Sequence, residues 1–318
     1  MRDKMVFMFS GQGSQYFHMG KAFYDHEPEF REQMNRLDAV FQELSGNSLI
    51  RYLYDERRSK SDEFVDLFYT HPAIFMVEVA TAHMLMSKGI RPQAVIGSSM
   101  GEYAAAVVAG ALDAEDGLRC LFDQARLLKA LSPPGGMIAV LTSPALYDEV
   151  PVIHHHAQLA AVNHQSHFVL AGNEEGLDVV ERYLRMKDIT HLRLPVTVPF
   201  HSAHIDAAGE AVRERLWQVT FRPPRIPFYS SVTGRRMPHL TANYFWDVLR
   251  QPIRFGEALN EAVAHGVTFI DLGPSGTLAN LANAHFRTKR DLHVFSLLSP
   301  FTGHQKALEM LYARLLQP

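Results

Sequence analysis

Hydrophobic and polar positions in the first half of the chain predict short buried strands alternating with longer helices. An apolar run at Val6–Ser10 and a second at Ala94–Ile96 are typical of buried strands. Helical spacing extends from about Ala22 to Leu44 and from about Thr70 to Ser87, and an alanine-rich helix is expected from Glu102 onward. Strands that alternate with helices in this way indicate an α/β fold class.

The pattern changes after the Ser132–Gly136 break, which is rich in proline and glycine. The following stretch predicts four strands and two helices in the order βαββαβ: strands at 137–142, 158–162, 168–171 and 191–195, and helices at 145–149 and 174–185. That order is typical of a ferredoxin-like unit. We therefore expect a small subdomain at 133–195, inserted into a larger domain formed by 1–132 and 196–318. Strands at Ile226–Val232 and Thr268–Leu272 would continue the larger domain.

Composition and charge exclude some classes of protein but do not indicate which reaction this one catalyses. Of 318 residues, 47% are hydrophobic and 20% are charged, which is ordinary for a globular protein. A formal net charge of -3 gives no reason to expect a nucleic acid or a membrane as partner. The single cysteine, Cys120, cannot form an internal disulfide, and no stretch resembles a signal peptide or a membrane span. We therefore expect a cytoplasmic enzyme.

A G-x-S-x-G sequence at Gly97–Gly101 provides the first candidate for chemistry. Its glycines allow a strand to turn sharply into a helix, which exposes the hydroxyl of Ser99 at the helix N-terminus. A chance match is expected in about one such chain in twenty. The predicted strand, turn and helix around Ser99 favour a nucleophile over a simple helix cap.

A serine nucleophile needs a base, and the chain offers 17 histidines. His201 follows the last predicted strand of the insert, where the chain returns to the larger domain, so we expect it to face the cleft between the two. The run His154–His156 is more simply a solvated loop than a metal site. His204 lies three residues after His201 but lacks an obvious third ligand, so no metal site is predicted.

Several spaced blocks resemble one family over essentially the whole chain. They are GQGSQ at 11–15, GSSMGE at 97–102, AVN at 161–163, VLAG at 169–172, VPFHS at 198–202, QPIRF at 251–255 and DLGP at 271–274. Together they are similar to the malonyl-CoA:acyl carrier protein transacylase family, which includes the acyltransferase domains of polyketide synthases. The resemblance implies an α/β-hydrolase-like large domain with an inserted ferredoxin-like subdomain.

The resemblance also assigns roles to residues. Ser99 would carry the acyl group, and His201 would act first as general base and then as general acid. The backbone N–H groups of Gln12 and Met100 would form the oxyanion hole, and the backbone carbonyl of Gln251 would orient His201 in place of a triad carboxylate. Ser99→Ala should therefore damage activity far more than Gln12→Ala, which leaves the backbone donor in place. No bound cofactor is expected.

This sequence departs from the family pattern at two positions. The residue before the nucleophile is commonly histidine in the family, and here it is Ser98. Members that use malonyl or methylmalonyl units have an arginine 25 residues after the serine, and here that position is Gln124. Nearby Arg119 and Arg126 lie off the helix stripe that contains Gln124, so they would not replace the missing charge.

Gln124 is the polar position of an otherwise apolar helical stripe, and this leaves two interpretations. It is either a core glutamine satisfied by backbone groups or part of the substrate pocket. The second interpretation, with Asn163 and Phe200 as further pocket residues, favours an uncharged acyl group. A buried carboxylate without a cation would lose a contact of about 1.5–3 kcal/mol.

Members with these departures resemble stand-alone acyltransferase-like proteins of trans-acyltransferase polyketide synthases, among them acyl hydrolases. The leading hypothesis is hydrolysis of a non-carboxylated acyl unit, such as acetyl, from the phosphopantetheine thioester of an acyl carrier protein. The alternatives are transfer of an acyl unit, malonyl or non-carboxylated, between CoA and carrier protein, a pseudoenzyme that only docks carrier proteins, and an ordinary esterase. Basic residues that are candidates for carrier docking are Arg235, Arg236, Arg287, Lys289 and Arg290.

Overall fold

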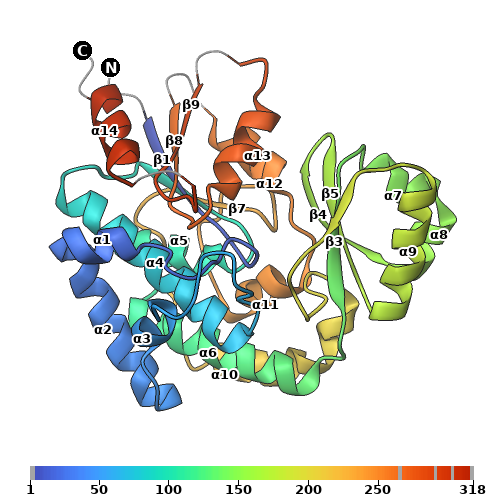
Figure 1. The fold of residues 1–318 in the computed structure, drawn as a ribbon, viewed down its shortest axis with the longest axis horizontal. Coiled ribbons are helices and arrows are strands. Elements are labelled where there is room, and N and C mark those ends of the chain that lie inside the picture. The colour runs from blue at the N-terminus through green and yellow to red at the C-terminus, as the bar shows by residue number, and fades with distance from the viewer. Residues whose placement is uncertain (1–3, 264–266, 290–291, 302–303, 316–318) are drawn as a thin grey trace.

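The structure is a computed structural model that describes residues 4–263, 267–289, 292–301 and 304–315. Two separate sheets organise the chain (Figure 1). The larger sheet is parallel, with strand order β7-β2-β1-β8-β9. Its strands are β1 (Lys4–Phe9), β2 (Ala94–Gly97), β7 (Phe228–Ser230), β8 (Val267–Asp271) and β9 (Leu292–Ser296).

Helices surround this parallel sheet, as strands buried on both faces require. Those before the second sheet are α1 (Lys21–His26), α2 (Pro28–Ser45), α3 (Leu49–Leu53), α4 (Leu67–Ser87), α5 (Gly101–Val108) and α6 (Ala114–Leu131). Those after it are the 3-10 helix η1 (Ala203–Ala208), α10 (Gly209–Leu216), α11 (Ala242–Arg250), α12 (Phe255–Ala262), α13 (Thr277–His285) and α14 (His304–Leu315).

The second sheet is antiparallel and forms the smaller lobe on the right of Figure 1. Its strand order is β4-β5-β3-β6, the order of a ferredoxin-like sheet. Its elements are β3 (Gly136–Val140), α7 (Ala145–Glu149), α8 (Pro151–His156), β4 (Gln158–His164), β5 (His167–Gly172), α9 (Glu174–Met186) and β6 (His191–Arg193). The predicted fold class, an α/β large domain with a ferredoxin-like insert, is therefore confirmed. The exact boundaries at 133 and 195 stay a prediction.

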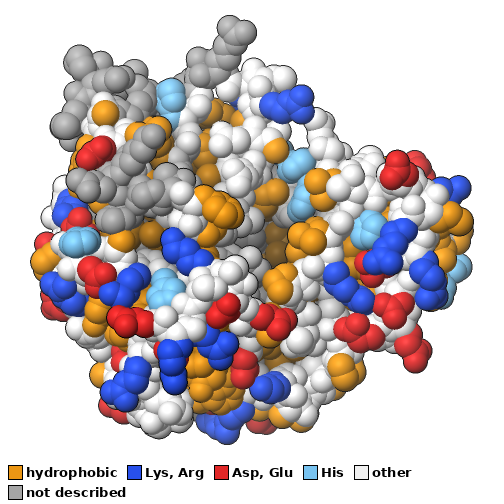
Figure 2. Space-filling model, in the orientation of Figure 1, with side chains coloured by type: hydrophobic (Ala, Val, Ile, Leu, Met, Phe, Trp, Pro, Cys, Tyr) orange, Lys and Arg blue, Asp and Glu red, His pale blue; other side chains and the backbone are white. Residues whose placement is uncertain are grey.

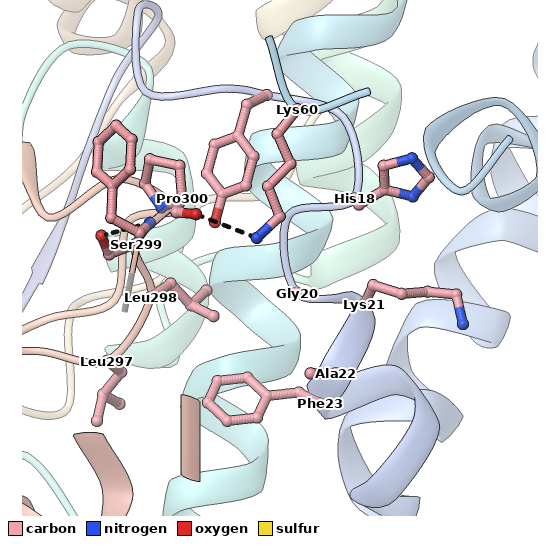
Figure 3. A pocket seen from close by; sticks show the side chains of 12 residues that line it. His18, Gly20, Lys21, Ala22, Phe23, Lys60, Leu297, Leu298, Ser299 and Pro300 are labelled. Atoms are coloured by element: carbon pink, nitrogen blue, oxygen red, sulfur yellow. Dashed lines mark hydrogen bonds between the residues drawn. The ribbon is translucent and has the colours of Figure 1, made fainter. Parts of the chain in front are cut away.

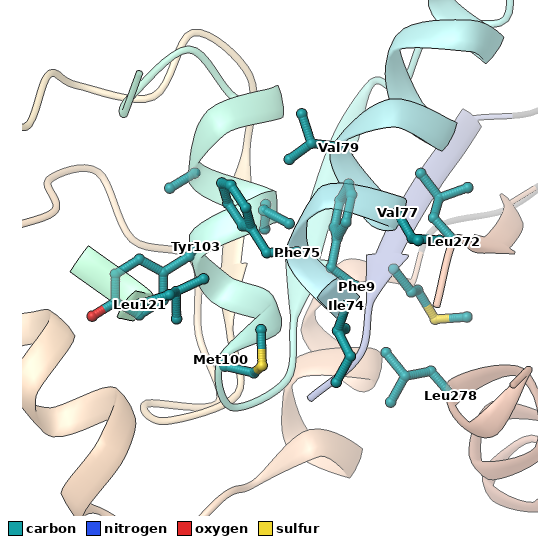
Figure 4. Packing of buried hydrophobic residues seen from close by; sticks show 14 of the residues in the cluster. Phe9, Ile74, Phe75, Val77, Val79, Met100, Tyr103, Leu121, Leu272 and Leu278 are labelled. Carbon is teal, nitrogen blue, oxygen red and sulfur yellow. The ribbon is translucent and has the colours of Figure 1, made fainter. Parts of the chain in front are cut away.

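Each sheet has its own hydrophobic core. In the large domain, side chains of β1, α4 and α5 pack closely, with Phe9, Phe75 and Tyr103 among the fully buried ones (Figure 4). In the small lobe, residues of β3 and β5 pack against α9 through Ile138, Leu170 and others. Burial of such side chains stabilises each layer by about 1.5–3 kcal/mol per large side chain.

The structure corrects three details of the sequence prediction. The helix expected over 22–44 is two helices, because Glu27 precedes Pro28 and is extended at φ -113° and ψ 103°. The run His154–His156 is the last turn of α8, not a loop. The strand expected over 226–232 is only three residues long, since the chain turns at Ser231.

Within the described part of the chain, no helix is long and apolar enough to cross a membrane.

Candidate active site

Ser99 occupies a sharp turn between strand β2 and helix α5. Its backbone has φ 54°, a left-handed conformation that is unfavourable for a residue with a side chain. The turn is fixed on one side by a hydrogen bond from the Ser98 N–H to the Phe9 carbonyl at 2.9 Å. On the other side the Glu102 N–H donates to the Ser99 carbonyl at 3.0 Å. The turn has the strained strand–turn–helix geometry of a nucleophile elbow, and the role of Ser99 as nucleophile stays a prediction.

Two glycines make the turn possible by allowing close backbone contacts. A Cβ atom on Gly101 would collide with the backbone carbonyls of Phe9 and Ser10. A Cβ atom on Gly11 would lie 2.9 Å from the Ser99 Cβ, closer than such atoms pack. The β1 loop and the start of α5 therefore approach each other only because neither glycine has a side chain.

His201 is the hydrogen-bond partner of Ser99. Its Nε2 lies 2.9 Å from the Ser99 Oγ, and its Nδ1 lies 3.0 Å from the Gln251 carbonyl oxygen. A carbonyl can only accept, so Nδ1 carries the proton and Nε2 presents its lone pair to the serine hydroxyl. The backbone of His201 also has a positive φ, 59°, and its N–H donates to the Leu249 carbonyl at 2.8 Å.

The carbonyl that orients His201 is held in place by the small subdomain. Two residues after Gln251, Ile253 donates its N–H to Ala160 at 2.9 Å and accepts from the Val162 N–H at 2.7 Å. Ala160 and Val162 belong to β4, so this strand of the insert fixes the segment that contains Gln251. His201 is therefore positioned by contacts from both parts of the molecule.

Burial determines the protonation state of the candidate base. His201 is 3% exposed, and this desolvation lowers the pKa of its imidazole to about 4, although the Gln251 carbonyl acts in the opposite direction. The ring is therefore neutral at pH 7. A neutral imidazole with a fixed tautomer can accept the serine proton.

Two backbone N–H groups, of Gln12 and Met100, belong to the loop and the turn that meet at Ser99. Within the described part of the chain, neither the Gln12 N–H nor the Met100 N–H donates a hydrogen bond. The loop that contains Gln12 is anchored by Ser10, whose N–H and Oγ both contact the buried Glu78 carboxyl, at 2.5 and 2.9 Å. These are the two donors expected to form the oxyanion hole, and their role stays a prediction.

The residues described above open into a cleft of about 320 Å³ between the two lobes. Figure 2 shows the molecule hollowed there, with hydrophobic side chains around the hollow. Ser99, His201, Asn163 and Phe200 line this cleft, together with the loop that contains Gln12 and with helix α13. Gln124 is not among the lining residues.

The sequence matches the family described as "Acyl transferase domain" over residues 6–316. The chain belongs to this family. The family expected from the sequence blocks is thereby confirmed.

Relatives and solved structures of the acyl transferase family agree over nearly full length. The polyketide biosynthesis acyltransferase homolog BaeD of Bacillus velezensis is 43% identical, with 100% of this chain and 98% of the relative covered. PksD of Bacillus subtilis, with the same description, is 39% identical over 97% of this chain and 95% of its own length. A loading acyltransferase from the avermectin modular polyketide synthase shares 27% identity at a TM-score of 0.88, covering 98% of this chain and 100% of that structure. MCAT from Streptococcus pneumoniae shares 28% at a TM-score of 0.82, with the same coverage.

Gln124 is buried on helix α6 and bonded to another side chain. Its side chain is 2% exposed and accepts a hydrogen bond from the buried Tyr103 hydroxyl at 3.0 Å, a side chain rather than the backbone. Both nearby arginines are bonded elsewhere. Arg119 donates to Glu43 at 3.2 Å and Arg126 to Asp123 at 3.3 Å. Neither therefore offers its charge to an acyl group near Gln124.

His167 was not among the residues predicted from the sequence, and the β4–β5 hairpin brings it into the cleft. Its Nδ1 lies 2.9 Å from the Asn163 amide nitrogen, and burial lowers the pKa of its ring to about 4. The sequence could have indicated this position of His167. The predicted strands at 158–162 and 168–171 form a hairpin, and residues on either side of a hairpin turn become neighbours.

Other hollows offer weaker sites. One of about 190 Å³ lies beside His18, Lys21 and Lys60 (Figure 3), but Lys60 already donates to the Pro300 carbonyl at 3.1 Å and Lys21 pairs with Asp25. His204 and the α8 histidines share a second hollow.

Among the described residues, no group of three side chains could hold a metal ion. Of the expected docking residues, Arg235, Arg236, Arg287 and Lys289 are exposed, and Arg290 lies outside the described residues.

Proposed function

We propose that this protein is a serine-dependent acyl hydrolase that removes uncharged acyl units, such as acetyl, from phosphopantetheine thioesters on acyl carrier proteins of polyketide biosynthesis. The observation that carries the proposal is Gln124, a buried neutral amide where malonyl-specific members have an arginine. A malonyl carboxylate there would lose its water without gaining a cation. The carrier protein as partner is supported by the printed names of the relatives, which are polyketide biosynthesis proteins.

The geometry supports a two-step reaction. The Ser99 Oγ attacks the thioester carbonyl carbon while its proton passes to His201 Nε2, 2.9 Å away. The C–S bond breaks, the proton moves to the departing sulfur, and the acyl group remains as an ester on Ser99. A water molecule then attacks the ester, gives its proton to His201, and the proton returns to Ser99 as the acid leaves. The Gln12 and Met100 N–H groups would stabilise the oxyanion in both steps.

The test compares acetyl-loaded with malonyl-loaded carrier protein, followed by intact-mass measurement. We expect loss of acetyl with release of acetate, little change in the malonyl form, and a transient acyl adduct on the peptide that contains Ser99. Ser99→Ala should abolish both the adduct and the hydrolysis, whereas the matched variant Ser98→Ala should keep the adduct. Fast malonyl transfer without loss of acetyl would contradict the proposal.

Transfer to a thiol is the second candidate, and membership in the acyl transferase family favours it. The same Ser99 ester would then pass its acyl group to the thiol of CoA or of another carrier. Acyl-enzyme prepared with radiolabelled acetyl and mixed with an acceptor thiol separates the two reactions. Label that appears in acetate supports hydrolysis, and label that appears in the thioester supports transfer.

A further inference from the structure

A buried histidine, His71, lies close to the cleft. His71, in α4, is 1% exposed, and among the residues that the structure describes neither of its ring nitrogens has a hydrogen-bond partner. Burial lowers the pKa of the ring to about 3, so the imidazole is neutral. An unpaired buried polar group costs free energy, which indicates that something else completes its hydrogen bonds.

The His71 ring lies directly behind the wall of the cleft. Its centroid is 5.6 Å from that of Phe200, with the two ring planes tilted by 38°. Phe200 lines the cleft and directly precedes the candidate base His201 in the chain. An acyl chain on Ser99 that extends along the Phe200 ring would therefore approach His71.

Helix α6 directs Gln124 toward the same space. Helices α4 and α6 run in opposite directions, because Phe75 packs against Gly117 while Phe68 packs against Phe122, at 4.6 Å between ring centroids. His71 is one turn before Phe75 on the same helix face, and Gln124 is two turns after Gly117 on its own face. Both polar positions thus lie on the facing sides of the two helices, about one helical turn apart along the pair.

The Gln124 amide is only half satisfied. Its oxygen accepts from the Tyr103 hydroxyl, but its Nε2 has no partner among the described residues. A neutral imidazole offers one N–H and one bare nitrogen, and the amide offers two N–H groups. A hydroxyl group complements this set, because it can accept from Gln124 and donate to the bare nitrogen of His71. A carboxylate does not, since the nearby arginines of the described chain, Arg119 and Arg126, are bonded elsewhere and do not replace its water.

We propose that His71 and Gln124 recognise a hydroxyl group on the acyl chain held by Ser99, which makes hydroxyacyl units the preferred substrate class. This inference rests on the proposed function, since it assumes that Ser99 carries an uncharged acyl group. It refines that function by predicting discrimination between two uncharged chains that differ only in one oxygen. Sites that hydrogen-bond a substrate hydroxyl reject the analogue that lacks it, because their own polar groups are then left unpaired.

The test uses carrier protein loaded with butyryl, 3-hydroxybutyryl or 4-hydroxybutyryl units and measures kcat/KM for deacylation by the full chain. We expect at least one hydroxyacyl unit to exceed butyryl by about tenfold or more, the value of one net hydrogen bond. His71→Leu and Gln124→Leu should each bring that ratio close to one, mainly through a slower hydroxyacyl reaction. His71→Gln, which retains a hydrogen-bonding group, should recover part of the preference.

The control is His83→Leu, the same substitution at a half-buried position of the same helix. It should leave the substrate ratio unchanged, and thermal unfolding of each variant shows whether it folds. Equal rates for all three units in the wild-type protein would overturn this inference while leaving acyl hydrolysis intact. If no uncharged unit loads Ser99 at all, the proposed function fails and this inference fails with it.

Discussion

The two candidate catalytic residues, Ser99 and His201, are both held in an unfavourable backbone conformation. Ser99 has φ 54° and His201 has φ 59°, and such strain costs about 1–3 kcal/mol for a residue with a side chain. In each case neighbouring hydrogen bonds compensate, from Ser98 to Phe9 and from His201 to Leu249. The strained backbone is therefore located at the two residues whose side chains are hydrogen-bond partners, through the Ser99 Oγ and the His201 Nε2.

The desolvation of His201 predicts how the rate of acyl-enzyme formation depends on pH. Because burial lowers the pKa of its ring to about 4, the neutral base is fully present from about pH 5.5 upward and is lost as pH falls through 4. We expect kcat/KM for acyl-enzyme formation to be flat from pH 5.5 to 8 and to fall at lower pH. A pH–rate profile in stopped-flow mode measures this.

His167 also lines the cleft and has a pKa lowered to about 4, so it needs its own control. His167→Gln removes that titration and should leave the acid limb of the profile in place. An inflection near pH 6.5 in both proteins would contradict a desolvated base.

Individual site residues could be predicted from the sequence where they lie in a recognisable motif, and could not be predicted where they do not. Ser99 lies in a recognisable elbow, and His201 in a block that resembles a known family. His71 has no such signature, because only the packing of α4 against Phe200 brings it near the cleft. Gln124 was recognised as a polar position on an apolar stripe, but its bond with Tyr103 comes from a different helix.

At the scale of elements, the site depends on how closely α5 approaches β1. Gly101 begins the helix in contact with the backbone of Phe9 and Ser10, at the point where β1 ends. This contact aligns the elbow with the loop that provides the Gln12 N–H. The predicted strand–turn–helix order therefore has a geometric requirement that only glycine meets.

Gly101→Ala should consequently damage both stability and catalysis. The new methyl group would collide with backbone atoms that cannot rotate away, and overpacking of this kind costs about 1–3 kcal/mol or more. We expect a lower denaturation midpoint in urea and a reduced rate of acyl-enzyme formation. Gly136→Ala is the matched control, because its Cβ would meet Leu177 at an ordinary 3.4 Å. Equal midpoints for the two variants would contradict this account.

Element order was more predictable than element boundaries. The βαββαβ order of the insert was correct because its alternating apolar residues and turns are local signals. The break between α1 and α2 was missed although Pro28 was visible, since the apolar stripe continues across it. The sequence analysis did not identify β9, whose place beside β8 is a tertiary pairing rather than a local pattern.

Across the whole molecule, buried carboxyl groups fix the loops at the ends of the parallel strands. Glu78 accepts from Ser10 after β1, Glu102 from Ser231 after β7, and Asp271 from the Gly273 and Ala279 N–H groups after β8. Burial raises the pKa of Glu102 to about 8, that of Asp271 to about 7, and that of Glu78 well above its usual value. Near neutral pH, Glu78 and Glu102 are therefore largely protonated in the folded protein, and Asp271 is about half protonated.

A raised pKa for an acid means that the folded state binds protons more tightly than the unfolded chain. For Glu102 this holds between about pH 4.5 and pH 8, so stability falls as pH rises through that window. Buried histidines such as His201 act in the opposite direction, but only below about pH 6.5, where the unfolded ring takes up protons. From pH 6.5 to 8 the carboxyl groups therefore determine the trend.

We accordingly expect the free energy of unfolding to decrease from pH 6.5 to pH 8.5, and Glu102→Gln to flatten that decrease. A neutral glutamine resembles the protonated acid and has no proton to lose, so the slope should shrink by up to about 1.4 kcal/mol per pH unit. Urea unfolding at several pH values measures the slope. Glu32→Gln makes the same substitution at an exposed site on α2 and should leave the slope unchanged. A wild-type protein that becomes more stable toward pH 8.5 would show that these carboxyl groups ionise freely in the fold.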